Sequence, residues 1–159
     1  MPARTAIALA AAALMCVPAW AATAIDDPVI FVRGVYAKLA SDQNYREPDD
    51  IYSPRLSALI ALEQKEAGGE VGRLDFDFWV NAQDWQLGDV TVSGEPVEGA
   101  KDREIVVAKF RNDDRKEEIH FYFERLSWAG WRLDDVRSFG DDGWTLSLIL
   151  KYGWDTPKK

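Results

Sequence analysis

The stretch REIVVAKFRNDDRKEEIHFYFERLSWAGWRLDDVRSF, residues 103–139, determines which fold the chain adopts. It contains three short runs of β-branched and aromatic residues, and the segments between them, RNDDRK and SWAGW, are typical of hairpin turns. In the middle run Ile119, Phe121 and Phe123 alternate with polar residues, so their side chains lie on one face of a strand. The stretch therefore predicts an antiparallel meander with one apolar face.

Two segments before residue 103 also have the composition of strands. They are LDFDFWV at 74–80 and LGDVTVSG at 87–94. Alternation along the first predicts a wet face and a dry face, with Asp75, Asp77 and Trp79 opposite Phe76, Phe78 and Val80. The residues that follow, NAQDW at 81–85, indicate a turn that leaves this strand.

Helical periodicity precedes the strands. The segment DDPVIFVRGVYAKLA, 26–40, offers Asp26 or Asp27 as the N-cap residue and Pro28 for the first helical position. The segment SPRLSALIALEQKEAGG, 53–69, begins in the same way and ends at its paired glycines. The tail DDGWTLSLILKYGW, 141–154, predicts a short C-terminal helix, with a further strand as the alternative.

The order of these elements predicts the α+β class. Helices that come first in the chain, followed by a run of strands, pack together on one face of the sheet. We expect N-terminal helices on a curved antiparallel sheet of four to five strands, followed by the short C-terminal helix.

The N-terminus has the features of a signal peptide. Arg4 is the only charged side chain before Asp26, and an apolar run follows it. The small-residue patterns AWA and ATA fit a signal peptidase, with cleavage after Ala21 or Ala24. The run is shorter than the about 20 apolar residues of a membrane span. We therefore expect a signal peptide over 1–24, a single α+β domain over 25–159, no membrane span after removal of the signal, and a periplasmic or secreted protein.

Cys16, the single cysteine, lies within this signal. Met15 precedes it where a lipoprotein signal has a small residue, so we expect cleavage rather than lipidation. A mature chain without a thiol has no disulfide, no thiolate zinc site and no cysteine nucleophile.

The charge of the mature chain excludes one class of partner. Removal of Arg4 leaves 18 basic residues against 27 acidic ones, a net charge of −9. Nucleic-acid phosphates require a basic surface, so this acidic protein is not expected to bind nucleic acid. An anionic membrane surface is unfavourable for the same reason.

Five stretches occur in an order that resembles a known family: FVRGVYAKLA, a link with a Tyr, IYSPRLSALI, LDFDFWVNAQDW and GWRLDDV. They resemble the bacterial envelope family called domain of unknown function 3828. The same order is similar to the nuclear-transport-factor-2-like, or cystatin-like, superfamily of cone-shaped α+β domains. The resemblance covers most of the mature chain and implies a cone-shaped, exported protein. It supplies no catalytic residue, and function does not follow from fold.

The candidate site centres on DFDFWVNAQDW, 75–85. At the mouth of the cone, a carboxylate beside indole rings loses water and its pKa rises towards the range used in acid–base chemistry. The candidate ligand-binding residues are Asp77, Gln83, Asp84, Trp85, Tyr36 and Tyr52. The alternative is structural: Asn81, Gln83 and Asp84 satisfy the backbone of a turn.

We expect no metal and no cofactor. His120 is the single histidine, and a zinc site needs more imidazole or thiolate ligands than one His supplies. The four Asp residues of WRLDDVRSFGDDGW, 131–144, lack the spacing of a calcium loop. Neither a nucleophile elbow nor a phosphate-binding loop is present.

Three functions agree with the sequence. The first is a non-enzymatic binding or accessory module that engages a protein partner or small molecule in the cell envelope, at the cone mouth or on an open sheet face. The second is a small hydrolase, isomerase or dehydratase that uses Asp77 and Asp84. The third is an immunity or inhibitor protein, which the acidic charge fits.

Overall fold

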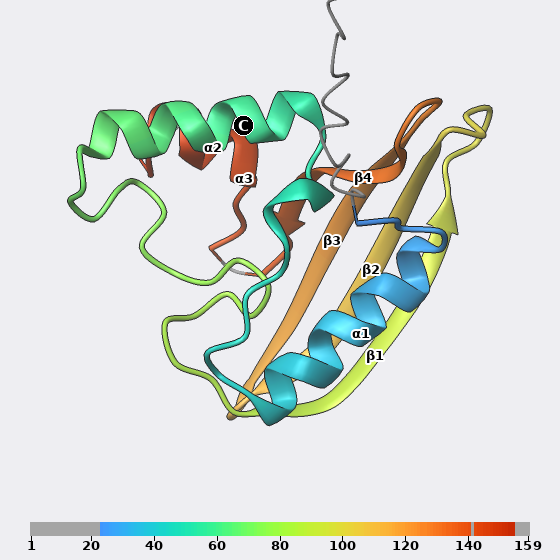
Figure 1. The fold of residues 1–159 in the computed structure, drawn as a ribbon. Helices are drawn as coiled ribbons and strands as arrows, with labels where there is room; N and C mark the ends of the chain where they lie inside the picture. The colour runs from blue at the N-terminus through green and yellow to red at the C-terminus, as the bar shows by residue number, and fades with distance from the viewer. Residues whose placement is uncertain (1–22, 141, 155–159) are drawn as a thin grey trace, which may run out of the picture.

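The computed structural model describes residues 23–140 and 142–154, which include three α-helices and a four-stranded antiparallel sheet (Figure 1). The chain therefore has the predicted α+β class. Of the predicted signal peptide, only Thr23 and Ala24 lie among the described residues. The elements, in chain order, are α1 (Pro28–Ser41), the 3-10 helix η1 (Asp49–Ile51), α2 (Pro54–Ala67), β1 (Leu87–Pro96), β2 (Arg103–Asn112), β3 (Arg115–Leu126), β4 (Gly130–Ser138) and α3 (Leu146–Tyr152).

The helix boundaries follow from their capping residues. Asp27 is the N-cap of α1, and its side chain accepts a hydrogen bond from the amide of Ile30 at 2.9 Å. Ser53 caps α2 in the same way, and Gly68 ends that helix in the left-handed conformation, at φ 62°. These predicted boundaries are confirmed, as is the short C-terminal helix α3.

The sheet is a meander in the order β1-β2-β3-β4. Because Phe121 lies opposite Val106 on β2 and Val136 on β4, these side chains share one face. We call it the inner face, since α1 packs on it over β1 and β2. Residues of β3 alternate between buried and partly exposed along almost the whole strand, which confirms the alternation predicted for Ile119, Phe121 and Phe123.

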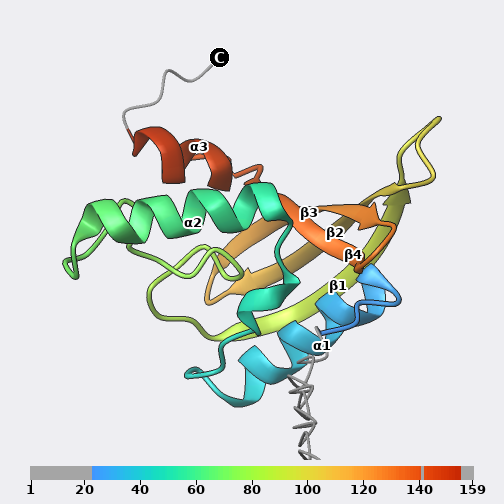
Figure 2. The same cartoon turned by 45° about the horizontal axis from the view of Figure 1, so that its top comes forward.

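The other helices lie at one side of the sheet. In both Figure 1 and Figure 2, α2 and α3 lie side by side, and each contacts β4. The opposite face of the sheet, which we call the outer face, includes the exposed residues Thr91, Lys109 and Arg137. Among the described helices, α1 contacts β1 and β2 on the inner face, while α2 and α3 contact β4.

The strand predicted over 74–80 is wrong, because this segment forms a turn. The amide of Trp79 donates to the Asp77 carboxylate at 2.9 Å, and Asp77 pairs with Ala82 in an isolated bridge. Asn81 takes the left-handed conformation at φ 53°. The reversal carries Trp79, predicted to face solvent, into the core, where it is 1 % exposed.

Trp79 fills the space between α1 and the inner face. Its ring stacks on Phe121, with centroids 4.5 Å apart and an interplanar angle of 24°. Phe31 and Tyr36 of α1 meet it edge-on at 6.4 and 6.3 Å. The middle of the fold is thus a packed aromatic cluster.

In the described parts of the chain, every helix is too short or too polar to cross a membrane.

Candidate functional site

Asp77 lies in a cluster of titratable side chains between the turn and the link that follows α1. One carboxylate oxygen accepts the Trp79 amide, and the other lies 3.9 Å from Nη1 of Arg46. Nearby, the Tyr52 hydroxyl donates to Oε1 of Glu47 at 2.5 Å. We call Tyr36, Arg46, Glu47, Tyr52 and Asp77 the Asp77 cluster.

Burial dominates the electrostatics of this cluster. It raises the pKa of Asp77 above its usual value, and the negative charge of Glu47 raises it further, while the Trp79 amide and Arg46 oppose the rise. Burial also raises the pKa of Tyr36 and of Tyr52, and the charge on Asp77 contributes to both shifts. Both phenols therefore stay protonated, and each donates within the fold: Tyr36 to the carbonyl of Trp79 at 2.6 Å and Tyr52 to Glu47. A carboxyl group with a raised pKa is the kind of group that acid–base chemistry uses.

The structure brings together only half of the predicted ligand-binding residues. Tyr36 and Tyr52 each lie close enough to Asp77 to interact with its charge. Trp85 instead lies in the core and donates from its indole nitrogen to the carbonyl of Leu39 at 3.2 Å. It has a structural role there.

The other two predicted residues belong to the turn. Gln83 donates from its side-chain amide to the carbonyl of Asp75 at 3.0 Å, which is the turn chemistry that the sequence offered as the alternative. Asp84 is exposed. The predicted pair of carboxylates, Asp77 and Asp84, is thus divided between a partly buried and a solvated environment.

The sequence did not single out Glu47, which is the carboxylate that interacts with Asp77. It lies in the polar link SDQNYREPDD, where charged residues are ordinarily solvated. The feature that identifies it is visible only in the folded structure: its carboxylate accepts a hydrogen bond from the Tyr52 hydroxyl.

The adjacent acids of the GWRLDDV motif have structural roles. Asp134 accepts hydrogen bonds from Ser53 at 2.7 Å and from Nε of Arg55 at 3.1 Å, which tie β4 to the start of α2. Burial acts to raise the pKa of Asp134, but these hydrogen bonds outweigh it and hold the pKa below its usual range. Asp135 accepts from both the amide and the hydroxyl of Ser147, which ties β4 to α3. The motif therefore connects β4 to α2 and to α3.

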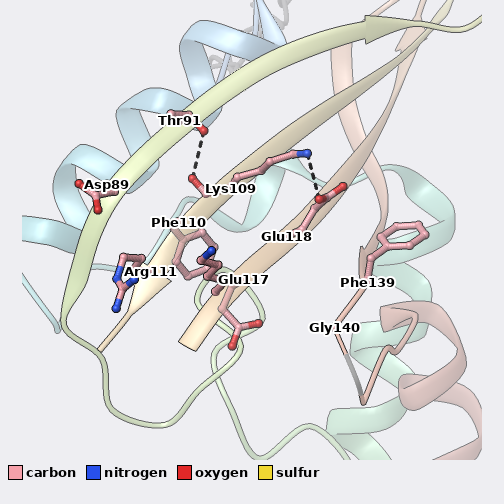
Figure 3. Close-up of a pocket in the computed structure, with 10 residues that line it drawn as sticks. Asp89, Thr91, Lys109, Phe110, Arg111, Glu117, Glu118, Phe139 and Gly140 are labelled. Atoms are coloured by element: carbon pink, nitrogen blue, oxygen red, sulfur yellow. Dashed lines mark hydrogen bonds and ion pairs between the residues drawn. The ribbon is translucent and has the colours of Figure 1, made fainter. Parts of the chain in front are cut away.

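A pocket of about 480 Å³ opens on the outer face, at the end of the sheet near the β2–β3 turn (Figure 3). Lys109 and Glu118 cross it as an ion pair, with Nζ and Oε2 3.0 Å apart. The other oxygen of Glu118 lies 2.7 Å from Nε2 of His120. The lining residues are Asp89, Thr91, Lys109, Phe110, Arg111, Lys116, Glu117, Glu118, Phe139 and Gly140.

Two features shape this pocket. Phe139 lies with its ring centroid 4.2 Å from that of His120, and its amide donates to the carbonyl of Glu118 at 3.1 Å, yet 55 % of the residue is exposed. On the opposite wall, β1 has an irregularity between Gly88 and Thr91, where Asp89 takes a left-handed φ of 52°. Such bulges bend an edge strand and redirect its side chains.

A second pocket, of about 370 Å³, lies beside the C-terminal end of α2 and is lined by Glu63, Glu66, Ala67, Glu70, Val71, Gly72 and Arg73. Neither pocket is lined by a residue of the Asp77 cluster or by Gln83, Asp84 or Trp85. Within residues 23–140 and 142–154, no three acidic, His or Cys side chains are placed to hold a metal ion.

Comparisons with protein-family models, with curated proteins and with solved structures found no match. The resemblance to the envelope family and to the cone-shaped superfamily stays a prediction.

Proposed function

We propose that the protein is a non-enzymatic binding or accessory module of the cell envelope, and that it engages a small ligand on its outer face. The observation that carries this proposal is the position of Trp79. A ligand inside a cone-shaped domain lies between the helices and the sheet, and here that space holds the Trp79 ring stacked on Phe121. Protein interiors are close-packed, so a ligand does not enter without displacing this ring.

The outer face, unlike the filled space around Trp79, has a pocket that is open to a ligand. Its pocket has a volume within the range of about 300–1,000 Å³ that is usual for small-molecule sites. It combines an exposed aromatic ring, Phe139, with charged side chains on three neighbouring strands. Most of the lining residues are charged, so the pocket suits a polar or charged ligand that also has an apolar part.

The second candidate function is acid–base catalysis at the Asp77 cluster. The raised pKa of Asp77, next to Glu47 and two protonated phenols, favours it. Glu47 replaces Asp84 as the second carboxylate in this hypothesis. However, the contacts of Asp77 with the Trp79 amide and with Arg46 also explain its position without any substrate.

One experiment separates the two functions. Wild type, Phe139→Ala and Asp77→Asn are each incubated with a small-molecule extract of the envelope, and bound compounds are identified by affinity mass spectrometry. We expect compounds that bind wild type and Asp77→Asn but are lost from Phe139→Ala. Compounds lost only from Asp77→Asn, or recovery of no compound at all, would contradict binding on the outer face.

We also propose membership of the envelope family, a cone-shaped fold and export with removal of the signal. Ile25 is buried and its carbonyl accepts a hydrogen bond from the Trp131 amide, so the folded domain includes residue 25. The Thr23 amide donates to Asp50 at 2.5 Å, which favours cleavage after Ala21. The intact mass of protein recovered from the periplasm tests this, and a mass that begins at Ile25 would contradict it.

A further inference from the structure

We propose that the outer-face pocket binds a small organic monoanion, with its acid group between Arg111 and Lys116 and its ring or apolar part on Phe139. This inference rests on the proposed function, in which the outer face is the binding surface. It adds the chemical class of the ligand and the residues that recognise it.

The register of the β2–β3 hairpin places two cations side by side. Arg111 and Lys116 are directly opposite each other on antiparallel strands, so their Cβ atoms are about 4.5–5.5 Å apart. Two like charges in this position repel each other and oppose strand pairing. A sequence that breaks a local rule without an internal compensation commonly does so at a functional site.

Other residues of the chain neutralise the positive charges of Arg111 and Lys116 only weakly. Arg111 lies 3.5 Å from Asp114, whose side chain is fully exposed, and ion pairs in that environment contribute little. In the part of the chain that the structure describes, no ion pair includes Lys116. The next cation along β2, Lys109, is by contrast neutralised by Glu118 at 3.0 Å. The positive charge at Arg111 and Lys116 thus stands out in a strongly acidic protein, and an anion complements it.

The walls of the pocket restrict the ligand further. Figure 3 shows Arg111 at one end, Asp89 on the β1 wall and Phe139 on the far side. Asp89, Glu117 and Glu118 all line the pocket, and their negative charges disfavour a ligand with a second acid group. The Phe139 ring, held by its contact with His120 and by its backbone bond to Glu118, gives a flat apolar surface on which a ring packs.

The test is a titration followed by two-dimensional ¹⁵N NMR at low salt. The probes are benzoate, phenyl phosphate and the neutral analogue benzamide. We expect benzoate to shift the amides of Arg111, Lys116 and Phe139, and to bind more tightly than phenyl phosphate, whose second charge faces Asp89. Benzamide lacks the charge-assisted contacts and is expected to bind at least about tenfold more weakly than benzoate.

Charge-removal variants complete the test. Arg111→Gln and Lys116→Gln are each expected to weaken benzoate binding about tenfold, since each loses one charged donor. Lys101→Gln is the matched control, because Lys101 is exposed in the segment between β1 and β2 and outside the pocket. Lys101 and Lys116 are exposed and Arg111 is partly exposed, so none of the three changes alters the core. The chemical-shift dispersion of the amide signals verifies that each variant is folded.

The outcomes distinguish this inference from the function on which it rests. Unchanged benzoate binding in the double variant R111Q/K116Q, or no shift at Arg111 and Lys116 with either anion, would overturn the monoanion inference. If benzamide then still shifts Phe139, binding on the outer face stands and only the ligand class is wrong. If none of the probes and no compound of the envelope extract binds at Phe139, both proposals fail.

Discussion

Replacement of Trp79 by Ala tests whether the interior of the fold is filled rather than available. Trp79 is 1 % exposed, stacks on Phe121 at 4.5 Å and meets Tyr36 edge-on. Loss of a fully buried Trp or Phe side chain costs about 3–5 kcal/mol, because both transfer free energy and packing contacts are lost. The indole nitrogen is buried without a hydrogen-bond partner, which lowers the benefit of the native residue. We therefore expect the lower half of that range.

Urea denaturation at pH 7, followed by far-UV circular dichroism, measures the free energy of unfolding of each variant. The milder change Trp79→Phe keeps an aromatic ring and removes the unpartnered N–H, so its expected cost is about 1–2 kcal/mol. Trp128→Ala is the control, since Trp128 is 76 % exposed between β3 and β4 and its loss is expected to change stability by less than about 0.5 kcal/mol.

If Trp79→Ala lowers the free energy of unfolding by less than about 1 kcal/mol, the interior is not filled as described. Such a result would mean that the space around the ring collapses or admits solvent at little cost. An equal loss at Trp79 and Trp128 would refute a filled interior as well. Either result would return the interior of the fold to the list of possible ligand sites.

Two further predictions concern the carboxylates of Asp77 and Glu63. Because the pKa of Asp77 is raised in the folded state, the stability linked to its protonation is present below the unfolded pKa of about 3.9 and is lost as pH rises through the folded pKa. Asp77→Asn keeps an oxygen that accepts from the Trp79 amide but does not titrate. In urea titrations, its free energy of unfolding relative to wild type is therefore expected to be higher at pH 7 than at pH 4. A lower relative value at pH 7 would contradict the raised pKa of Asp77. A Cβ at Gly72 would lie 1.8 Å from Oε1 of Glu63, which accepts the next backbone amide, so Gly72→Ala is expected to lose about 1–2 kcal/mol in thermal melts. In Gly34→Ala the new methyl meets no atom within 4 Å and lies in a helix, so a gain of about 0.5–1 kcal/mol is expected; the same effect at both glycines would contradict the steric argument.

The parts of the fold that local sequence determines were predictable. Asp27 and Ser53 cap their helices through side-chain hydrogen bonds that span only three residues, and the alternation of β3 requires only one dry face. The segment 74–80 was not predictable in this way. Its alternation is that of a strand, but the Asp77 side chain competes for the backbone and Phe121, distant in sequence, provides the surface that Trp79 packs on.

The candidate site shows the same division. Asp77, Tyr36 and Tyr52 have the residue types expected of a site, whereas Glu47 is recognised only when the link folds back beside Tyr52. The cation pair of the outer face was accessible from sequence, since a hairpin turn over RNDDRK already places Arg111 opposite Lys116. Phe139 was not, because its position depends on the ring contact with His120.

Both candidate sites contain charges that their surroundings disfavour, but they differ in how far the chain itself compensates those charges. The carboxylate of Asp77 is partly buried, but the chain itself supplies a donor in the Trp79 amide and a cation in Arg46, so contacts within the fold stabilise its charge. Arg111 and Lys116 repel each other across two strands, and the ion pair that Arg111 makes is with the solvated Asp114. An unfavourable arrangement that the fold does not relieve is relieved on binding, and the ligand gains the corresponding free energy as affinity. This asymmetry is why we expect the outer face, rather than the Asp77 cluster, to respond to an added anion.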